Sequence, residues 1–378
     1  MRQFLLILIA IATVYGSAPA KAQDQKAQFP QWPNQLQDEV LNMYQAGFSG
    51  QIHLFVKDLT TGVRYTHNAA TPTYIASVVK ILFMVELFDQ VERGKLSLDD
   101  YVEFTSEDVR SGSPLFNYLP IGARLPVRVL AEAMIQQSDN AASDLVANLV
   151  GLDKINSGYK ARGYKGVGQI TRLLDVRHLV FGQLDPRITT FTPRQFRSID
   201  FSKGGEAKAK KIKEYLGSGT SNITPRNIDR AYRNYYKTGY NSATMETVGQ
   251  LLEDLYLGHV VSSTASQAMI DILKGTQTGA GRISAYLPPN TPIAHKTGTQ
   301  YRRTCDVGVV ETPNKKAFVF AACIKGSKGL KRDEVIARLA YSAYNLLSTD
   351  EATASKFESA PSNKKKRKKR RRRRKAKL

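Results

Sequence analysis

Strand-like sequence patterns lie near the two ends of the chain, and a long, mostly helical stretch separates them. In residues 51–57, the apolar side chains of Ile52, Leu54 and Val56 alternate with other residues, which is the period of a half-buried strand. After a turn, residues 63–67 return, and similar signals come back only late, at residues 292–295, 306–311 and 317–324. Strands from both ends must pair to bury their apolar faces. We therefore expect one antiparallel sheet, an α+β fold and a separate helical lobe.

Apolar residues at helical spacing predict the helices around and between these strands. The segment 169–224 is basic and has no clear period, and we expect it to be irregular. The 378 residues then hold one domain, 23–350, with a sheet lobe at about 34–80 and 260–348 and a helical lobe at about 81–259. We expect the functional site in the cleft between the lobes. The predicted helices span residues 34–44, 78–91, 127–137, 141–150, 228–237, 245–256 and 332–347.

The first 22 residues have the layout of a secretory signal peptide. Arg2 precedes an apolar run from Phe4 to Val14, and small residues follow up to Ala20-Lys21-Ala22. The apolar run is too short to span a bilayer. We expect cleavage after Ala22 and a location in the periplasm or cell envelope, and an uncleaved membrane anchor is the alternative.

The other end of the chain is strongly basic. Thirteen of the residues 364–378 are Lys or Arg, which is more than half of the net charge of +22. Such a run repels itself and buries no core, so we expect residues 351–378 to be a disordered polybasic tail. In an exported protein the polyanions within reach are envelope polymers and lipid head groups, and we do not expect nucleic acid as a partner. A passive, solvated tail is the alternative.

Two cysteines, Cys305 and Cys323, lie in the apolar runs of two expected strands. Residues 312–315 between them are typical of a turn. A hairpin folded there places the two cysteines nearly opposite each other, so a cross-strand disulfide is geometrically possible. Two buried free thiols are the alternative.

A candidate nucleophile opens the helix that follows the first strand pair. Ser77 and Lys80 stand three residues apart, so both side chains lie on one face of a helix. A serine hydroxyl attacks only when a base takes its proton, and a dehydrated lysine amine can serve as that base. The same Ser-x-x-Lys spacing recurs at Ser157 and Ser362, which we interpret as surface residues.

Two further polar motifs follow in the chain. Ser138-Asp139-Asn140 stands between two predicted helices, where it could simply cap the second helix or supply a hydroxyl and an amide to a substrate. Lys296-Thr297-Gly298-Thr299 ends a predicted strand and offers a cation, two hydroxyls and room for a ligand backbone. Lys237-Thr238-Gly239 has the same three residue types as Lys296-Thr297-Gly298. It ends a predicted helix, where a lysine and a following glycine are common at the C-terminal cap.

The three motifs in this order resemble those of the class A β-lactamases and of related penicillin-recognising D,D-peptidases. The resemblance runs from about Asn34 to Leu347 and implies a five-stranded antiparallel sheet flanked by helices, plus an all-helical lobe. It also implies a serine hydrolase that acts on a β-lactam or a D-Ala-D-Ala-type peptidoglycan peptide. We expect a monomer that needs no cofactor or metal, since the histidines show no metal-binding spacing.

The resemblance also implies roles for single residues. Ser77 would form the acyl-enzyme, Lys80 would act as its base, and Ser138 would relay a proton to the leaving nitrogen. Asn140 would bind the substrate's side-chain amide. Its carboxylate would be held by the last motif, residues Lys296, Thr297, Gly298 and Thr299. The amide N–H groups of Ser77 and Thr299 would form the oxyanion hole.

One feature of the class A enzymes is missing from the sequence. These enzymes use a loop glutamate to activate the deacylating water, and the similar stretch here, residues 171–178, contains none. Arg177 or His178 is expected at that position, and Asp175 is the nearest carboxylate along the chain. Two alternatives therefore stand beside a β-lactamase: a D,D-peptidase or slowly deacylating penicillin-binding protein, and a non-catalytic envelope binding protein.

Overall fold

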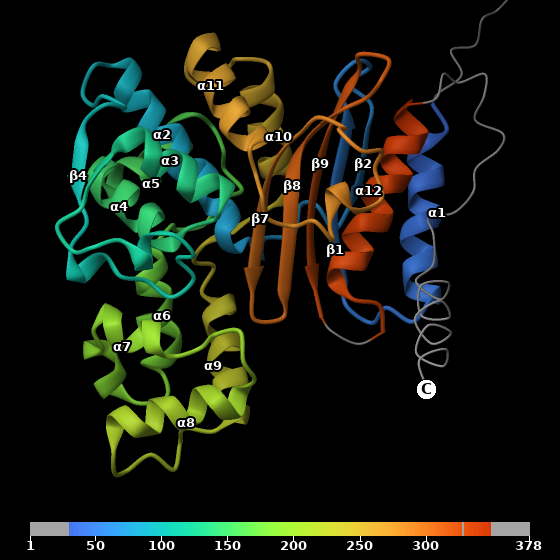
Figure 1. The fold of residues 1–378 in the computed structure, drawn as a ribbon. Helices are drawn as coiled ribbons and strands as arrows, with labels where there is room; N and C mark the ends of the chain where they lie inside the picture. Colours follow the sequence, from blue (N-terminus) through green and yellow to red (C-terminus); the bar gives the residue numbers. More distant parts are fainter. Residues whose placement is uncertain (1–29, 327–328, 349–378) are drawn as a thin grey trace, which may run out of the picture. The chain divides into compact units, whose positions relative to one another are not determined.

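A five-stranded antiparallel sheet forms the centre of the protein (Figure 1). The computed structural model describes residues 30–326 and 329–348, and the compact unit begins at Gln31. The predicted signal peptide and basic tail lie outside the described residues. The strand order is β2-β1-β9-β8-β7, so strands from both ends of the chain pair as expected, and the predicted fold class is confirmed. The strands are β1 (Gln51–Asp58), β2 (Arg64–His67), β7 (Ile293–Gln300), β8 (Arg303–Glu311) and β9 (Ala317–Lys325).

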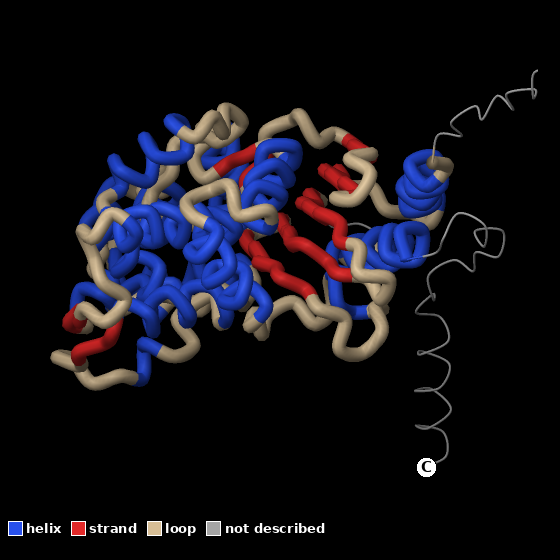
Figure 2. The backbone as a smooth tube through the Cα atoms, turned by 90° about the horizontal axis from the view of Figure 1, so that it is seen from above, coloured by secondary structure: helices blue, strands red, loops and turns tan. Residues whose placement is uncertain are grey.

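Helices cover both faces of this sheet (Figures 1 and 2). On one face α1 (Trp32–Gln45) and α12 (Arg332–Ser348) pack together over apolar side chains such as Leu54 and Phe320. On the other face α10 (Met245–Tyr256) lies across β1, β8 and β9, although its residues fall in the range expected for the helical lobe. Burial on both faces explains why β8 and β9 are almost continuously buried, and why β9 is apolar from Ala317 to Ile324 instead of alternating.

The helical part is organised around α2 (Lys80–Glu92), whose residues from Lys80 to Phe88 are all buried. A helix that is apolar on all sides belongs in a core. Four helices contact it, namely α3 (Val127–Gln136), α4 (Asn140–Val150), α5 (Leu152–Ala161) and α11 (Ser263–Lys274). Short strand pairs complete the lobe: β3 (Thr73–Tyr74) with β6 (Ser242–Ala243), and β4 (Tyr101–Glu103) with β5 (Arg124–Pro126).

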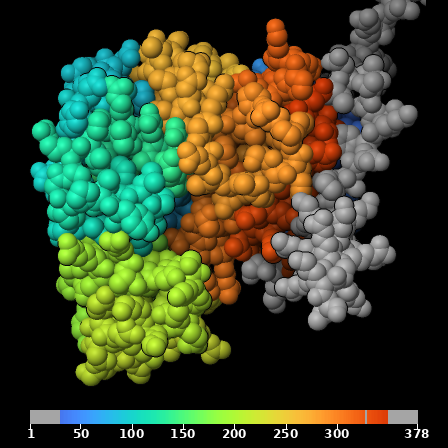
Figure 3. Space-filling view, in the orientation of Figure 1, coloured from blue at the N-terminus to red at the C-terminus, as the bar shows by residue number. Residues whose placement is uncertain are grey.

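The prediction that residues 169–224 are irregular was wrong. They hold α6 (Leu173–Phe181), α7 (Pro193–Ser198) and α8 (Gly205–Leu216), and α9 (Pro225–Lys237) follows. These four helices, residues 173–237, are called the insert here, and they lie together in the space-filling view (Figure 3). Its apolar side chains form a core of their own around Phe181, Phe196 and Tyr232. The helices are short and carry many exposed cations, so the helical spacing of their apolar residues is hard to recognise in the sequence. Thr192 and Thr224 nevertheless cap helices that begin with proline.

Cys305 on β8 and Cys323 on β9 stand opposite each other in the strand register. A disulfide joins them, with a Cα–Cα distance of 4.1 Å. Both are buried in the core between the sheet and the helical lobe. Of the two possibilities left open by the sequence, the structure contains the cross-strand bridge.

Candidate active site

Ser77 lies in a 3₁₀ turn, η1 (Ala76–Val79), that leads directly into α2. The preceding residue, Ala76, has φ +50°, a left-handed conformation that costs a non-glycine residue about 1 kcal/mol or more. Strand β7 passes close to this turn at Gly298, where a Cβ atom would lie 2.5 Å from the Ile75 carbonyl oxygen. Only glycine fits there, so the Gly298 position brings the edge of the sheet to Ser77.

Lys80 is fully buried at the start of α2. Its Nζ donates to the Ser138 carbonyl oxygen at 2.6 Å and to Asn140 Oδ1 at 2.9 Å, and it lies 3.2 Å from Ser138 Oγ. Burial lowers the Lys80 pKa to about 7, although Asp139 and Asp144 act in the opposite direction. The described part of the chain provides no hydrogen bond to the Ser77 hydroxyl, which leaves that oxygen half-buried and available.

The corner between α3 and α4 presents Ser138 and Asn140 to Lys80. Ser138 has φ +57°, a second strained residue at the site. Asp139 caps α4 through the amides of Ala141 and Ala142, as its capping interpretation predicted, and so holds the corner in place. The capping role belongs to Asp139, and the neighbouring serine and asparagine remain free to face the site.

Lys296 on β7 is the second fully buried lysine. Its Nζ lies 3.0 Å from Ser138 Oγ, so one hydroxyl bridges the amines of Lys80 and Lys296, which are far apart in the sequence. Burial lowers the pKa of Lys296 well below its usual value, and the nearby charge of Lys80 adds to this effect. A proton on Lys80 therefore disfavours a proton on Lys296.

Thr297 and Thr299 follow on the same strand, and Arg282 joins them. Thr299 is exposed, and its hydroxyl accepts a hydrogen bond from the Arg282 guanidinium at 2.6 Å. Arg282 is itself buried and paired with Asp333 at 3.1 Å. The sequence motifs gave no role to Arg282, because its place beside Thr299 depends on the path of a loop. Thr297 Oγ1 is hydrogen-bonded to Thr278 Oγ1 at 2.6 Å.

The comparisons with known proteins agree with this geometry. The sequence model of the Beta-lactamase enzyme family matches residues 34–347. The chain belongs to the β-lactamase enzyme family.

Two curated β-lactamases are similar over much of the chain. CTX-M-8 of Citrobacter amalonaticus is 24% identical over 316 residues, covering 82% of this chain and 84% of that protein. VEB-1 of Pseudomonas aeruginosa is 22% identical over 262 residues, covering 67% of this chain and 70% of that protein.

Solved structures show the same fold. A β-lactamase from Chitinophaga pinensis has a TM-score of 0.61 at 20% identity, covering 83% of this chain and 98% of that one. The structure of PBP-A has a TM-score of 0.61 at 18% identity, covering 84% of this chain and 96% of that one. The recognition of a class A-like fold from the three motifs is therefore confirmed.

Residues 171–178, which the sequence resemblance likens to the glutamate loop of class A β-lactamases, include the start of α6. The amides of Leu173 and Leu174 donate to the buried Asp144 carboxylate at 2.7 and 3.0 Å. Both leucines line a small hollow together with Asn140 and Arg177. Arg177 lines this hollow, whereas the His178 ring contacts Phe196 and hydrogen-bonds to the Phe191 carbonyl at 2.9 Å.

Asp175, the nearest carboxylate along the chain, and the two glutamates of α8 do not line this hollow. Asp175 pairs with Arg172 at 3.2 Å at the start of α6. Glu206 and Glu214 are exposed on α8, and Glu214 pairs with Lys211. Among the residues described, none of these carboxylates lines the hollow beside Asn140.

Across the described ranges 30–326 and 329–348, no group of three His, Cys, Asp or Glu side chains is arranged to hold a metal ion. His295, next to Lys296, hydrogen-bonds to the buried Asp306 at 2.9 Å, which is the local partner expected for a strand histidine. Within the same ranges no helix is long and apolar enough to cross a membrane.

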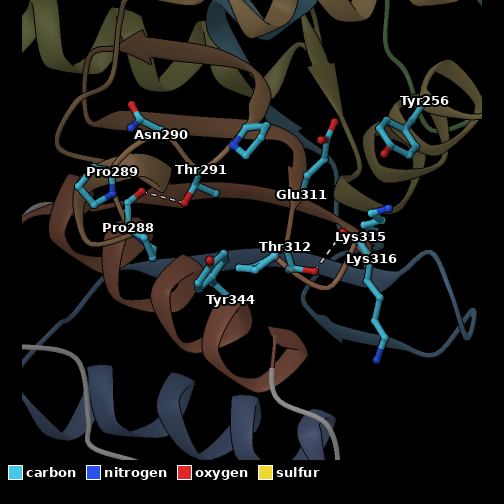
Figure 4. A pocket seen from close by; sticks show the side chains of 12 residues that line it. Tyr256, Pro288, Pro289, Asn290, Thr291, Glu311, Thr312, Lys315, Lys316 and Tyr344 are labelled. Carbon is cyan, nitrogen blue, oxygen red and sulfur yellow. Dashed lines mark hydrogen bonds between the residues drawn. The ribbon is translucent and has the colours of Figure 1, made fainter.

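A second hollow lies away from Ser77, at the start of β7 (Figure 4). Residues 288–292 and the β8–β9 turn form its walls, and Tyr344 of α12 and Tyr256 of α10 contribute aromatic rings. None of the residues expected to carry the chemistry lines it. The candidate active site is therefore the Ser77 region.

Proposed function

We propose that this protein is an exported serine hydrolase whose Ser77 forms an acyl-enzyme with a β-lactam or a D-Ala-D-Ala-type cell-wall peptide. The observation that carries the proposal is the Ser138 hydroxyl held between the buried amines of Lys80 and Lys296, with Lys80 three residues after Ser77 where η1 leads into α2. The β-lactamases among its relatives support a hydrolase. The signal-peptide layout of residues 1–22 supports export to the periplasm or envelope.

The arrangement supports a definite order of steps. An incoming carboxylate near Thr299 and Arg282 favours the protonated form of Lys296, and repulsion then keeps Lys80 neutral. Neutral Lys80 accepts the Ser77 proton as the Ser77 oxygen bonds to the carbonyl carbon.

The amides of Ser77 and Thr299 stabilise the resulting oxyanion. When the carbon–nitrogen bond breaks, Ser138 gives its proton to the leaving nitrogen and takes one back from Lys80. Asn140 holds the acyl side chain of the substrate through its amide.

The second half of the reaction lacks a base. Deacylation needs a group that takes a proton from water near neutral pH. Leu173 and Leu174 line the hollow beside Asn140 together with Arg177, and neither leucine can accept a proton. This observation favours the second candidate, a slowly deacylating penicillin-binding protein or D,D-peptidase. One similar solved structure is a leucine-to-glutamate mutant of PBP-A, captured as an acyl-enzyme complex with penicillin G.

Labelling with a fluorescent penicillin tests the proposal. The wild type should be labelled covalently, and Ser77→Ala should not. Ser157→Ala is the matched control, because Ser157 has the same Ser-x-x-Lys spacing on an exposed helix, and it should label like the wild type. A wild type without label would leave a non-catalytic binding protein. Steady turnover of a chromogenic cephalosporin indicates a β-lactamase, and a single stoichiometric burst indicates the slowly deacylating protein.

A further inference from the structure

Arg177 is a half-buried cation at the edge of the candidate active site. It lies on α6, and its Nε donates to Ser111 Oγ at 3.3 Å. The Ser111 carbonyl oxygen accepts from Asn140 Nδ2 at 2.7 Å, and Asn140 is bonded to Lys80. Arg177, Ser111 and Asn140 also line the same small hollow. Arg177 is therefore connected to the expected substrate-binding amide through one serine.

The surroundings of Arg177 contain hydrogen-bond donors and aromatic rings but no counter-ion. Its second nitrogen donates to the Tyr232 hydroxyl at 3.3 Å, and its guanidinium lies 3.7 Å above the centre of the Phe201 ring. Among the described residues no carboxylate comes within ion-pair distance of Arg177, whereas Arg172, which directly precedes the insert, and Arg187 within it each have an aspartate. A guanidinium has five N–H donors, and two long bonds to neutral hydroxyls leave most of its capacity unused.

Gly112 adjoins the side-chain amide of Asn140 and has no side chain to press on it. This residue is exposed, with φ +81°, and a Cβ atom on it would lie 2.6 Å from Asn140 Nδ2. A side chain there would press on the amide that faces the hollow. With glycine at this position no side chain presses on the Asn140 amide, which is hydrogen-bonded to Ser111, the residue whose hydroxyl accepts from Arg177.

We propose that Arg177, with the hydroxyl of Ser111, binds a carboxylate on the acyl side of the scissile bond. This group would be additional to the carboxylate assigned to Lys296 and Thr299. The inference rests on the proposed acylation of Ser77 and names its preferred substrates: β-lactams with an acidic side chain, or wall peptides with an acidic group before the scissile bond. Arg177 is in this sense a specificity residue and takes no part in proton transfer.

Two penicillins that differ by one carboxylate test the inference. Carbenicillin is benzylpenicillin with an additional carboxylate on its side chain. We expect the wild type to be acylated by carbenicillin about tenfold faster than by benzylpenicillin, as second-order rate constants at low salt, because charge-assisted hydrogen bonds discriminate at this level. Arg177→Gln should bring the ratio near one while benzylpenicillin acylation persists. Arg197→Gln, which removes an exposed cation of the same insert, should keep the wild-type ratio.

The possible outcomes separate the two proposals. No acylation of Ser77 by either penicillin would overturn the proposed function. Acylation by both at equal rates in the wild type, or a preference that survives Arg177→Gln, would overturn the role of Arg177 and leave the function intact. If Arg177→Gln shows no cooperative melting, the ratio is read from Arg177→Lys, expected to be intermediate, and from the wild type in rising salt, where it should fall.

Discussion

Lys80 shows how a single buried side chain gives the site its pH dependence. The amine must be neutral to take the Ser77 proton, and burial brings its pKa from 10.5 to about 7. Below that pH the amine is protonated and inactive as a base. We therefore expect the rate of penicillin labelling to rise with pH up to about 7 and then to level off.

The measurement is the labelling rate between about pH 5 and 9. Lys80→Arg is the informative variant, because a guanidinium keeps its proton throughout this range, and labelling should be lost at every pH. A labelling rate that climbs only near the usual pKa of lysine would contradict the assignment of Lys80 as base.

Leu173 and Leu174 offer a second test at the residue scale. Both side chains are half-buried beside Asn140. Replacing each in turn by glutamate supplies the missing base, and we expect one of the two variants to turn over a chromogenic cephalosporin about tenfold faster or more. The same replacement at Leu179, exposed on the same helix, should change nothing. Equal, slow turnover in all three would show that deacylation is limited by something other than a carboxylate.

At the scale of elements, Asp144 ties α4 to the start of α6. Its carboxylate accepts the amides of Leu173 and Leu174 and pairs with the buried Arg110 at 2.7 Å. Removing one partner of a buried pair leaves an uncompensated charge. We expect Asp144→Ala to lower the free energy of unfolding by about 3–5 kcal/mol, measured by urea denaturation.

Asp175→Ala is the matched control, since the pair with Arg172 is partly exposed and should be worth about 1 kcal/mol or less. Asp144→Asn should lower the free energy of unfolding by an amount between those of Asp175→Ala and Asp144→Ala. An amide oxygen still accepts hydrogen bonds, but it carries no charge for Arg110. Similar losses for Asp144→Ala and Asp175→Ala would argue against Asp144 as the anchor of α6.

At the scale of the whole molecule, the basic tail leads to a prediction about where the protein is held. If residues 364–378 hold the protein to anionic envelope polymers or lipids, truncation after Ser362 should release it from envelope fractions. High salt should release the full chain in the same way, because screening weakens exposed charge contacts. The truncated protein should still be labelled by penicillin. Retention of the truncated protein on envelopes would indicate a different tether.

The sequence by itself determined the elements and the motifs. Local periodicity located α1, β1, α2, α10 and α12 within a few residues, and the order of Ser77, Ser138 and Lys296 identified the family. These signals are readable because each depends on neighbours in the chain. The segment 169–224 was misread because its short, cation-rich helices bury their apolar side chains against one another and against distant residues such as Tyr74, and no local pattern records these contacts.

Only the tertiary structure determined which side chains of the site contact one another and how burial changes their pKa values. One hydroxyl joins Lys80 and Lys296 although Ser138 and Lys296 are 158 residues apart, and the low pKa of Lys80 comes from burial that no local pattern records. Arg282 beside Thr299 and Arg177 beside Ser111 also depend on the packing of distant segments. Motif spacing predicts which groups are present, whereas dehydration and long-range contacts, which set their reactivity, arise only when the chain has folded.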